Sequence, residues 1–408
     1  MPGPFVVPVH GDTELPKEVD CVVIGGGIIG TSTALELAER GLRVALCEKG
    51  GIGQEQSSRN WGWVRISRRD PREVPLMAEA LRIWARLSER TGRDTGYARA
   101  GIVFTCADDK EYEQHERWGR HLQGYQLESR MISAGELRDL LPGSNLDVKG
   151  ALYTPADGRA EPQKAAPAIA EAARDRGAAI LTECAVRGVE TTSGAVSGVV
   201  TERGFIACKA VVLAGGAWSN LFCGTLGLDL PQLKVMNTVL RTTPVENGPD
   251  QAVWANNFAI RKRQDGGYTV ASSMSNLVDI VPNSFRYARD FLPAWRQSGD
   301  RCNSDWVVVS FTRQGCRPAG RWMRRAPSNT AACSIPSLPK KARSAFLQMP
   351  ARHFPFWQRQ RWRSAGPAIS TSRRTPFPSF APLTRFPAFM WRPVSQAMVS
   401  ASGPRQAG

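Results

Sequence analysis

The sequence predicts an α/β protein, on three observations. Residues 20–49 run strand, glycine turn, helix, strand, the order that builds a parallel sheet. Further along, residues 157–178 read as a loop and then a helix, and residues 235–244 and 266–273 read as strands. The last segment, residues 301–408, has no periodicity, so we predict that it is irregular or disordered.

The first unit begins with a β-branched run, Val22–Ile24, that enters a cluster of glycines. Apolar residues then recur with helical spacing between Ala34 and Ala38, and Gly41 is placed to end the helix. A second strand, "RVALCE" (43–48), ends on an acid. These features form a βαβ unit in the order typical of dinucleotide binding.

Each feature of the turn has a mechanical reason. Gly25 allows the tight turn after the strand, and Gly27 lacks a Cβ, so a pyrophosphate can approach the backbone. Gly30 lets the helix pack closely on the strand, and the helix N-terminus faces the phosphates. Glu48, 18 residues after Gly30, would accept hydrogen bonds from an adenosine ribose, and its charge disfavours a 2′-phosphate. FAD and NAD share this half, so the unit alone leaves both open.

The basic character of the chain belongs to its tail. The net charge is +16, from 53 Lys and Arg against 37 Asp and Glu. Residues 306–408 hold 17 of the basic residues and none of the acidic ones, which leaves a net charge of −1 before them. A basic tail usually indicates a polyanion partner. This tail is also rich in Trp, Phe, Pro and Ser without repeats, which disfavours a simple nucleic-acid-binding arm.

The cysteine and histidine patterns indicate neither a metal site nor a secreted protein. None of the nine cysteines forms a CxxC pair, and the four histidines form no cluster. The chain start shows no secretion signal, and no apolar stretch reaches about 18 residues. We therefore expect no metal, no transmembrane segment and a cytoplasmic protein with reduced thiols. His115 and His121 lie in a charged helical pattern and are expected on a solvated face.

Five segments, in order, carry a resemblance to a known family. They are the glycine turn through Glu48, "SSRNWGWVR" (57–65), "GALYTPADGRAEPQKAAPAIAEAARDRGA" (150–178), "VVLAGGAWS" (211–219) and "DGGYTVA" (265–271). Together they resemble the FAD-dependent D-amino acid oxidase superfamily, and within it bacterial enzymes related to glycine and sarcosine oxidases. The resemblance spans about residues 18 to 297.

The resemblance implies a discontinuous architecture. A Rossmann-like FAD-binding domain would comprise residues 18–95 and 150–225. An α+β substrate domain with an antiparallel sheet over the flavin would comprise residues 96–149 and 226–300. Residues 1–17 would form an N-terminal extension, and residues 301–408 a basic tail unlike the family.

Non-covalent FAD is also implied. The predicted cofactor-binding residues are Gly25, Gly26, Gly27, Ile28, Ile29, Gly30, Glu48, Lys49, Ser57, Ser58, Arg59, Asn60, Trp61, Gly62, Val186, Ala214, Gly215, Gly216 and Trp218. Some relatives attach the flavin through a His in the loop after the ribose acid or through a Cys near the C-terminus. Here that loop offers Ser57, Ser58 and Arg59, so a covalent link is not expected.

The candidate catalytic residues are Arg65, Arg261 and Tyr268. Arg65 follows the loop that would face the flavin, whereas the other two lie on predicted strands of the roofing sheet. A guanidinium fork or a phenol hydroxyl suits a substrate carboxylate. Packing roles for Trp61 and Trp63, and structural roles for the three candidates, stay open at this point.

The implied function is oxidation of a small-molecule amine or amino acid: a D-amino acid, glycine or an N-alkyl amino acid. Hydride would pass from the substrate α-carbon to flavin N5, water would hydrolyse the imine, and the electrons would pass to oxygen or a quinone. We expect no nucleic-acid partner. Two alternatives remain open: an NAD-dependent dehydrogenase, and a non-catalytic protein whose basic tail binds nucleic acid.

The tail reads like family coding sequence in the wrong frame. The superfamily closes its flavin site with a loop resembling Gly-His-Gly-Phe-Gly-Ile-Gly-Pro. "QAMVSASGP" (396–404) permits the codons CAG GCC ATG GTT TCG GCA TCG GGC CCN. Joining each third base to the next two bases gives that loop. The same regrouping of residues 365–368, 372–380 and 387–395 permits family-like segments in family-like order. We therefore predict a frameshift between about residues 295 and 310, and weak or no FAD binding by this chain.

Overall fold

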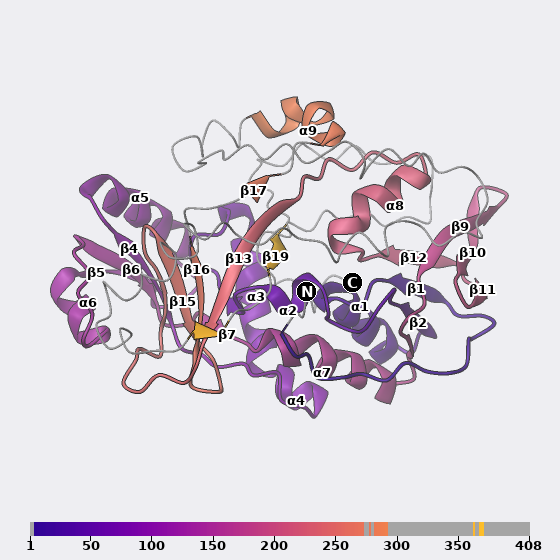
Figure 1. Ribbon diagram of the computed structural model, residues 1–408, viewed down its shortest axis with the longest axis horizontal. Coiled ribbons are helices and arrows are strands. Elements are labelled where there is room, and N and C mark those ends of the chain that lie inside the picture. Colours follow the sequence, from indigo (N-terminus) through magenta and orange to yellow (C-terminus); the bar gives the residue numbers. More distant parts are fainter. Residues whose placement is uncertain (1–3, 273–276, 279–280, 293–361, 364–366, 371–408) are drawn as a thin grey trace.

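The computed structural model describes residues 4–272, 277–278, 281–292, 362–363 and 367–370. Two sheets organise these residues. A four-stranded parallel sheet lies to the right in Figure 1, and a ten-stranded sheet lies to the left. The α/β fold predicted from the sequence, with a parallel sheet and antiparallel sheets, is confirmed.

The parallel sheet has the strand order β12-β1-β2-β8. Its strands are β1 (Cys21–Ile24), β2 (Val44–Cys47), β8 (Ala179–Leu181) and β12 (Ala210–Leu213). Every residue of β1 and β2 is buried, as expected for parallel strands covered on both faces. Helix α1 (Ile28–Glu39) follows the glycine turn and packs against α7 (Pro162–Asp175). Proline at the first position of α7 suits a helix start.

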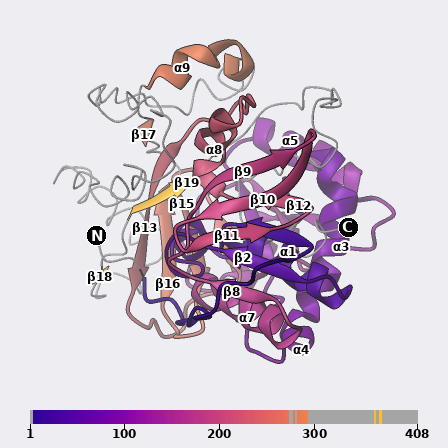
Figure 2. The ribbon, with the colours of Figure 1, turned by 90° about the vertical axis from the view of Figure 1, so that its right-hand side faces the viewer.

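A three-stranded antiparallel meander adjoins the parallel sheet and faces the viewer in Figure 2. Its strands are β9 (Val186–Thr192), β10 (Ala195–Thr201) and β11 (Gly204–Ala207). A hydrophobic cluster that includes Val22, Cys47, Cys184 and Val199 fills the space between meander and sheet. The N-terminal segment packs on the same sheet, because the Asp12 amide donates to the Ile180 carbonyl at 2.8 Å.

The ten-stranded sheet has the order β17-β13-β16-β15-β14-β4-β6-β5, with β18 and β19 also paired to β13. Its strands are β4 (Ile102–Cys106), β5 (Arg130–Ser133), β6 (Gly150–Thr154), β13 (Val235–Thr242), β14 (Ala252–Trp254), β15 (Phe258–Lys262), β16 (Tyr268–Ser272), β17 (Leu277–Val278), β18 (Trp362–Arg363) and β19 (Pro367–Ser370). Only the β14–β4 pairing is parallel among those described. The strands predicted at residues 235–244 and 266–273 are β13 and β16, and they pair with each other.

The remaining described elements are helices, 3₁₀ turns and one pair of short strands. The helices are α2 (Gln56–Arg59), α3 (Val74–Ala85), α4 (Leu87–Thr91), α5 (Asp109–Gly119), α6 (Ala134–Leu140), α8 (Ser219–Thr225) and α9 (Pro282–Arg286). The 3₁₀ turns are η1 (Pro71–Glu73), η2 (Arg120–Leu122) and η3 (Gly216–Trp218), and β3 (Trp63–Val64) pairs with β7 (Gly158–Arg159). Helices α1, α4 and α7 lie together on one face of the parallel sheet (Figure 1).

The structure corrects the expectation for His115, and it does not test the expectation for most of the tail. His115 is buried rather than solvated, and its Nδ1 lies 3.1 Å from Cys106 Sγ. The reason is that His115 and Trp118, three residues apart, form the inward face of the otherwise charged helix α5. We predicted an irregular tail at residues 301–408, and of these residues the structure describes only strands β18 and β19. The rest of the tail, and the predicted frameshift, lie outside the described residues.

No helix among the described residues combines the length and apolarity that crossing a membrane requires. The same residues contain no group of three or more His, Cys, Asp or Glu side chains arranged to hold a metal ion.

Candidate functional site

The glycine turn lies where strands β1 and β12 end. Gly25 has φ +114°, a conformation that side chains disfavour, and a Cβ there would lie 2.4 Å from the Ala214 carbonyl oxygen. A Cβ on Gly30 would lie 1.8 Å from the Gly25 carbonyl oxygen. Neither position has room for a side chain. Glycine therefore lets α1 start directly against the strand ends.

The N-terminus of α1 is free of acidic side chains in its first turn, and Gly27 caps it without a side-chain hydrogen bond. The Ile28 amide donates to the Ser57 hydroxyl, 2.9 Å away on α2. A Cβ on Gly27 would meet only this hydroxyl, at 3.0 Å. The helix dipole and the remaining amides of the turn make this end of α1 suited to a phosphate group.

Glu48 follows β2 and lies beside the turn. Its Oε2 accepts from the Gly26 amide at 2.6 Å and its Oε1 from the Gly50 amide at 2.9 Å. Burial raises the pKa of this carboxyl, while the two amides and neighbouring Lys49 favour its charged form. Each carboxylate oxygen has a further lone pair, so the group can also accept from two sugar hydroxyls.

The segments after β2 and β12 meet at the rim of this site. Lys49 Nζ lies 3.8 Å from the centroid of the Trp218 ring and 2.9 Å from Glu55 Oε1. Lys234 Nζ lies 5.5 Å from the same ring. Lys49 and Trp218, predicted from separate segments, are therefore neighbours. Ala214, directly after β12, is tied to β1 because its amide donates to the Ile24 carbonyl at 2.8 Å.

The loop after α2 forms a tight turn. Asn60 Oδ1 accepts from the Gly62 amide at 2.7 Å, and Asn60 Nδ2 donates to the Ser57 carbonyl at 2.9 Å. Gly62 has φ +73°, which favours glycine. Half-buried Trp61 packs on Trp63 with ring centroids 5.4 Å apart, and on Trp254 of β14 at 5.1 Å.

The other loop residues lie nearby, with one exception. Ser58 Oγ donates to the Glu55 carbonyl, and Arg59 lies 3.5 Å from the Glu55 carboxylate. Val186 instead begins β9, and its side chain is buried in the cluster between sheet and meander. A cofactor contact at Val186 would therefore involve its backbone.

The three candidate catalytic residues are buried and engaged within the chain. Arg65 donates to the Ser67 carbonyl, and its guanidinium carbon lies 5.5 Å from the Phe104 ring centroid. The Tyr268 hydroxyl donates to the Pro249 carbonyl at 2.6 Å, and burial raises its pKa. Their roles toward a substrate stay predictions.

Arg261, the third candidate, has a partner that the sequence did not reveal. Its Nη1 lies 2.8 Å from Glu161 Oε1 in a buried ion pair. A substrate carboxylate would have to compete with this pair. Asp157 was also missed: it is fully buried and accepts from the Ile66 amide at 2.7 Å and from the Ser67 hydroxyl. No sequence signal links Glu161 with Arg261 or Asp157 with Ser67, because the two members of each pair lie far apart along the chain.

The site residues fit a dinucleotide. A side chain would fill the cradle at Gly25 and Gly30, the α1 N-terminus offers amides to a pyrophosphate, and Glu48 offers a carboxylate to a ribose. Parallel strands, glycine turn and terminal acid together define a dinucleotide-binding protein of the Rossmann type.

Comparison with known proteins places the chain more narrowly. Residues 20–327 match the model of the DAO family, FAD dependent oxidoreductase, and the chain belongs to this family. The family model decides between the two dinucleotides that the glycine turn left open, in favour of FAD. The resemblance found in the sequence is thereby confirmed.

Sequence similarity to individual proteins agrees with this family assignment. The chain is 30% identical to mitochondrial sarcosine dehydrogenase of Mus musculus over 252 residues, which is 60% of this chain and 27% of that protein. It is 32% identical to glycine oxidase of Geobacillus kaustophilus (strain HTA426) over 221 residues, 52% of this chain and 58% of the relative. The chain thus matches less than two thirds of the length of these curated relatives.

A solved structure gives the same result for the fold. The L-amino acid deaminase from Proteus myxofaciens, in complex with anthranilate, superposes with a TM-score of 0.81 at 30% identity. The match covers 90% of this chain and 83% of that one.

Proposed function

We propose that the chain oxidises a small amine or amino acid (a D-amino acid, glycine or an N-alkyl amino acid) with FAD as cofactor. The observation that carries this proposal is the glycine turn beside Glu48, in a chain of the FAD dependent oxidoreductase family. Its relatives include a glycine oxidase and sarcosine dehydrogenases, which act on amino acids by name.

We assign the FAD-binding domain to residues 18–95 and 150–225, and the substrate domain to residues 96–149 and 226–300. In support, the parallel strands lie in the first set and all strands of the ten-stranded sheet up to β17 lie in the second, except β6. Strand β6 begins at Gly150 and pairs with β4, so the ten-stranded sheet continues across that boundary as far as Thr154.

The residues of the chain would hold FAD without a covalent bond. Amides of the α1 N-terminus and the Ser57 hydroxyl would hold the pyrophosphate, and Glu48 would accept from the ribose hydroxyls. When bound, FAD supplies the hydride acceptor for amine oxidation. Trp61 and Trp254, half-buried and in ring contact with each other, would exclude water near the reacting carbon. Arg65 would orient a substrate carboxylate.

The finer points of the proposal are the electron acceptor and the location. We propose oxygen or a quinone as the acceptor, supported by relatives that include both an oxidase and dehydrogenases. We propose a cytoplasmic location, supported by free thiols at six described cysteines, as expected in a reducing compartment.

The test starts with nucleotide binding. The purified chain, and a version with its reading frame restored after about residue 300, are titrated with FAD and with NAD⁺. Glycine, sarcosine and D-alanine are then added without oxygen, and bleaching of flavin absorbance is followed before a quinone or oxygen is admitted. We expect the frame-restored chain to bind FAD and at least one amine to bleach its flavin, whereas the chain without restoration should bind FAD weakly or not at all. Binding of NAD⁺ alone, or flavin that no amine bleaches, would contradict the proposal.

A further inference from the structure

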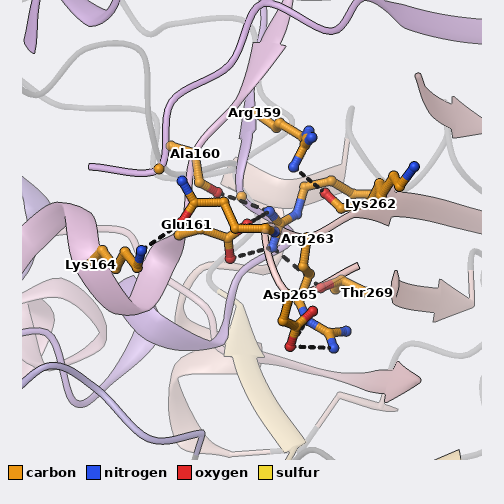
Figure 3. Close-up of polar contacts among 12 residues, drawn as sticks. Arg159, Ala160, Glu161, Lys164, Lys262, Arg263, Asp265 and Thr269 are labelled. Atoms are coloured by element: carbon orange, nitrogen blue, oxygen red, sulfur yellow. Dashed lines mark hydrogen bonds and ion pairs between the residues drawn. The ribbon is translucent and has the colours of Figure 1, made fainter. Parts of the chain in front are cut away.

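A buried ion pair joins the start of α7 to the ten-stranded sheet. Arg261 on β15 is 1% exposed and Glu161, directly before α7, is 7% exposed. The guanidinium faces both carboxylate oxygens, with Nη1 at 2.8 Å and Nη2 at 3.5 Å. Figure 3 shows this contact region, with Ala160, Glu161 and Lys164 on the α7 side and Lys262, Arg263 and Thr269 on the sheet side.

The same guanidinium supports the turn formed by Asn60, Trp61 and Gly62. A Cβ on Gly62 would lie 3.0 Å from Arg261 Cζ and 2.6 Å from the Ala160 carbonyl oxygen. That carbonyl accepts from Arg261 Nη1 at 3.1 Å, and the Ala160 amide donates to the Gly62 carbonyl at 2.8 Å. Arg261 therefore packs against the turn at Gly62, and Ala160 links the two through hydrogen bonds to both.

The contact continues toward the glycine turn. Gln163, in the first turn of α7, donates through Nε2 to the Ser58 carbonyl at 2.8 Å. Its neighbour Ser57 accepts from the Ile28 amide at the start of α1. One continuous set of contacts therefore runs from β15, through the start of α7 and α2, to the end of α1 that faces the cofactor.

A buried ion pair of this kind seldom adds stability, because removing two charges from water costs about as much as their attraction returns. Its fork geometry, however, fixes orientation more narrowly than apolar packing does. Here the Glu161 carboxylate also accepts from the Gln264 amide at 3.0 Å, so both partners are held in place.

We propose that Arg261 and Glu161 are positioning residues: their ion pair sets the position of the Asn60–Gly62 turn, and through it the placement of Trp61 at the cofactor. This inference rests on the proposed function, since it takes FAD to lie along that turn. It gives Arg261 a role that acts through the turn rather than on the substrate.

The test compares Arg261 with Arg263, a matched control. Arg263 is equally buried, two residues away, and donates to the Tyr268 and Thr242 carbonyls, but none of its described contacts reaches the turn. The variants are Arg261→Lys, Arg263→Lys, and the double variant Glu161→Gln with Arg261→Met, which removes both charges together. Hydrogen exchange of individual backbone amides is measured for each variant, and FAD affinity is measured for each variant in the frame-restored chain.

We expect the Arg261 variants to speed exchange at the Gly62 and Ala160 amides by about tenfold or more, and Arg263→Lys to speed it only near β13 and β16. FAD affinity should fall about tenfold for the Arg261 variants and stay within about twofold for Arg263→Lys. The double variant should lose more FAD affinity than Arg261→Lys, because the lysine variant keeps a cation at this position.

Unchanged exchange at Gly62 in Arg261→Lys and in the double variant would overturn the inference. So would equal effects of Arg261→Lys and Arg263→Lys, because that result describes general loosening. If the double variant does not fold, the two lysine variants still give the comparison. A frame-restored chain that binds no FAD would count against the proposed function, whereas the exchange pattern would still decide the positioning role.

Discussion

The Ile28 amide donates its hydrogen bond to the Ser57 hydroxyl at 2.9 Å, and this contact joins the first turn of α1 to α2. A helix start normally lacks partners for its first amides, and a neighbouring element here supplies one of them. The hydroxyl hydrogen of Ser57 stays available to a second acceptor. The dinucleotide site is therefore built from two helices rather than from the βαβ unit alone.

Ser57→Ala should weaken both the fold and the site. Loss of the hydroxyl leaves the Ile28 amide without its acceptor, so we expect the free energy of unfolding to fall by about 1 kcal/mol. FAD affinity should fall about fivefold, the equivalent of about 1 kcal/mol. Denaturant unfolding, and FAD titration of the frame-restored chain, measure these effects. Ser58→Ala is the matched control, because Ser58 Oγ donates within its own turn to Glu55. Equal results for the two serines would show that the α1 contact has no special role.

Gly30→Ala should be strongly destabilising. The added methyl group would lie 1.8 Å from the Gly25 carbonyl oxygen, so α1 must move away from β1. Overpacking of this kind costs about 1–3 kcal/mol. Gly224→Ala in α8 is the control, because a Cβ there meets nothing within 4 Å and its φ is not positive. We expect the control to be neutral or slightly stabilising, since alanine favours helices. Thermal unfolding of both variants measures the difference: the midpoint should fall for Gly30→Ala and stay constant or rise slightly for Gly224→Ala.

Asp157 should make the fold less stable as the pH rises. Burial raises the pKa of this carboxyl from its ordinary 3.8 to about 6. Between these values the folded protein keeps a proton that the unfolded chain releases. The stabilisation is therefore complete below about pH 4 and is lost as the pH rises through about 6, a change on the order of 3 kcal/mol. Denaturant unfolding from pH 4 to 7 measures it.

The matched variants for this pH effect are Asp157→Asn and Asp250→Asn. The first removes the titrating group and should flatten the profile between pH 4 and 6. The second removes a carboxylate that is largely exposed and pairs with Lys262, so the slope should match that of the wild type. A slope that survives Asp157→Asn would assign the effect to another group.

Restoring the reading frame should restore FAD affinity. A chain that carries the glycine loop in place of residues 396–404 should bind FAD about tenfold tighter or better, which is at least about 1.4 kcal/mol. The physical reason is that the resemblance assigns one wall of the flavin site to this loop. The control is a restored chain whose loop glycines are replaced by alanine. Equal affinities of the printed and restored chains would contradict the frameshift interpretation, and the DNA around codons 290–312 tests its origin directly.

Local signals explain what the sequence could predict. The βαβ unit, with Gly25, Gly30 and Glu48, is readable because strand, turn, helix and acid follow one another within 30 residues. The burial of His115 does have a sequence signal, because Trp118 lies three residues further on the same helix face. The pairing of Glu161 with Arg261 had none, because the partners lie 100 residues apart and meet only when α7 reaches the sheet.

Arg65 and Arg261 should respond differently to substrates with and without a carboxylate. If Arg65 orients the substrate, Arg65→Lys loses the fork geometry, and KM for sarcosine should rise about tenfold while KM for an N-methylamine without a carboxylate stays nearly constant. Arg261→Lys acts through the turn, so kcat/KM should fall by the same factor for both substrates. Steady-state kinetics of the frame-restored chain measure this difference. A loss confined to sarcosine in Arg261→Lys would instead favour direct carboxylate binding, and the Glu161 pair would then have to open in each catalytic cycle.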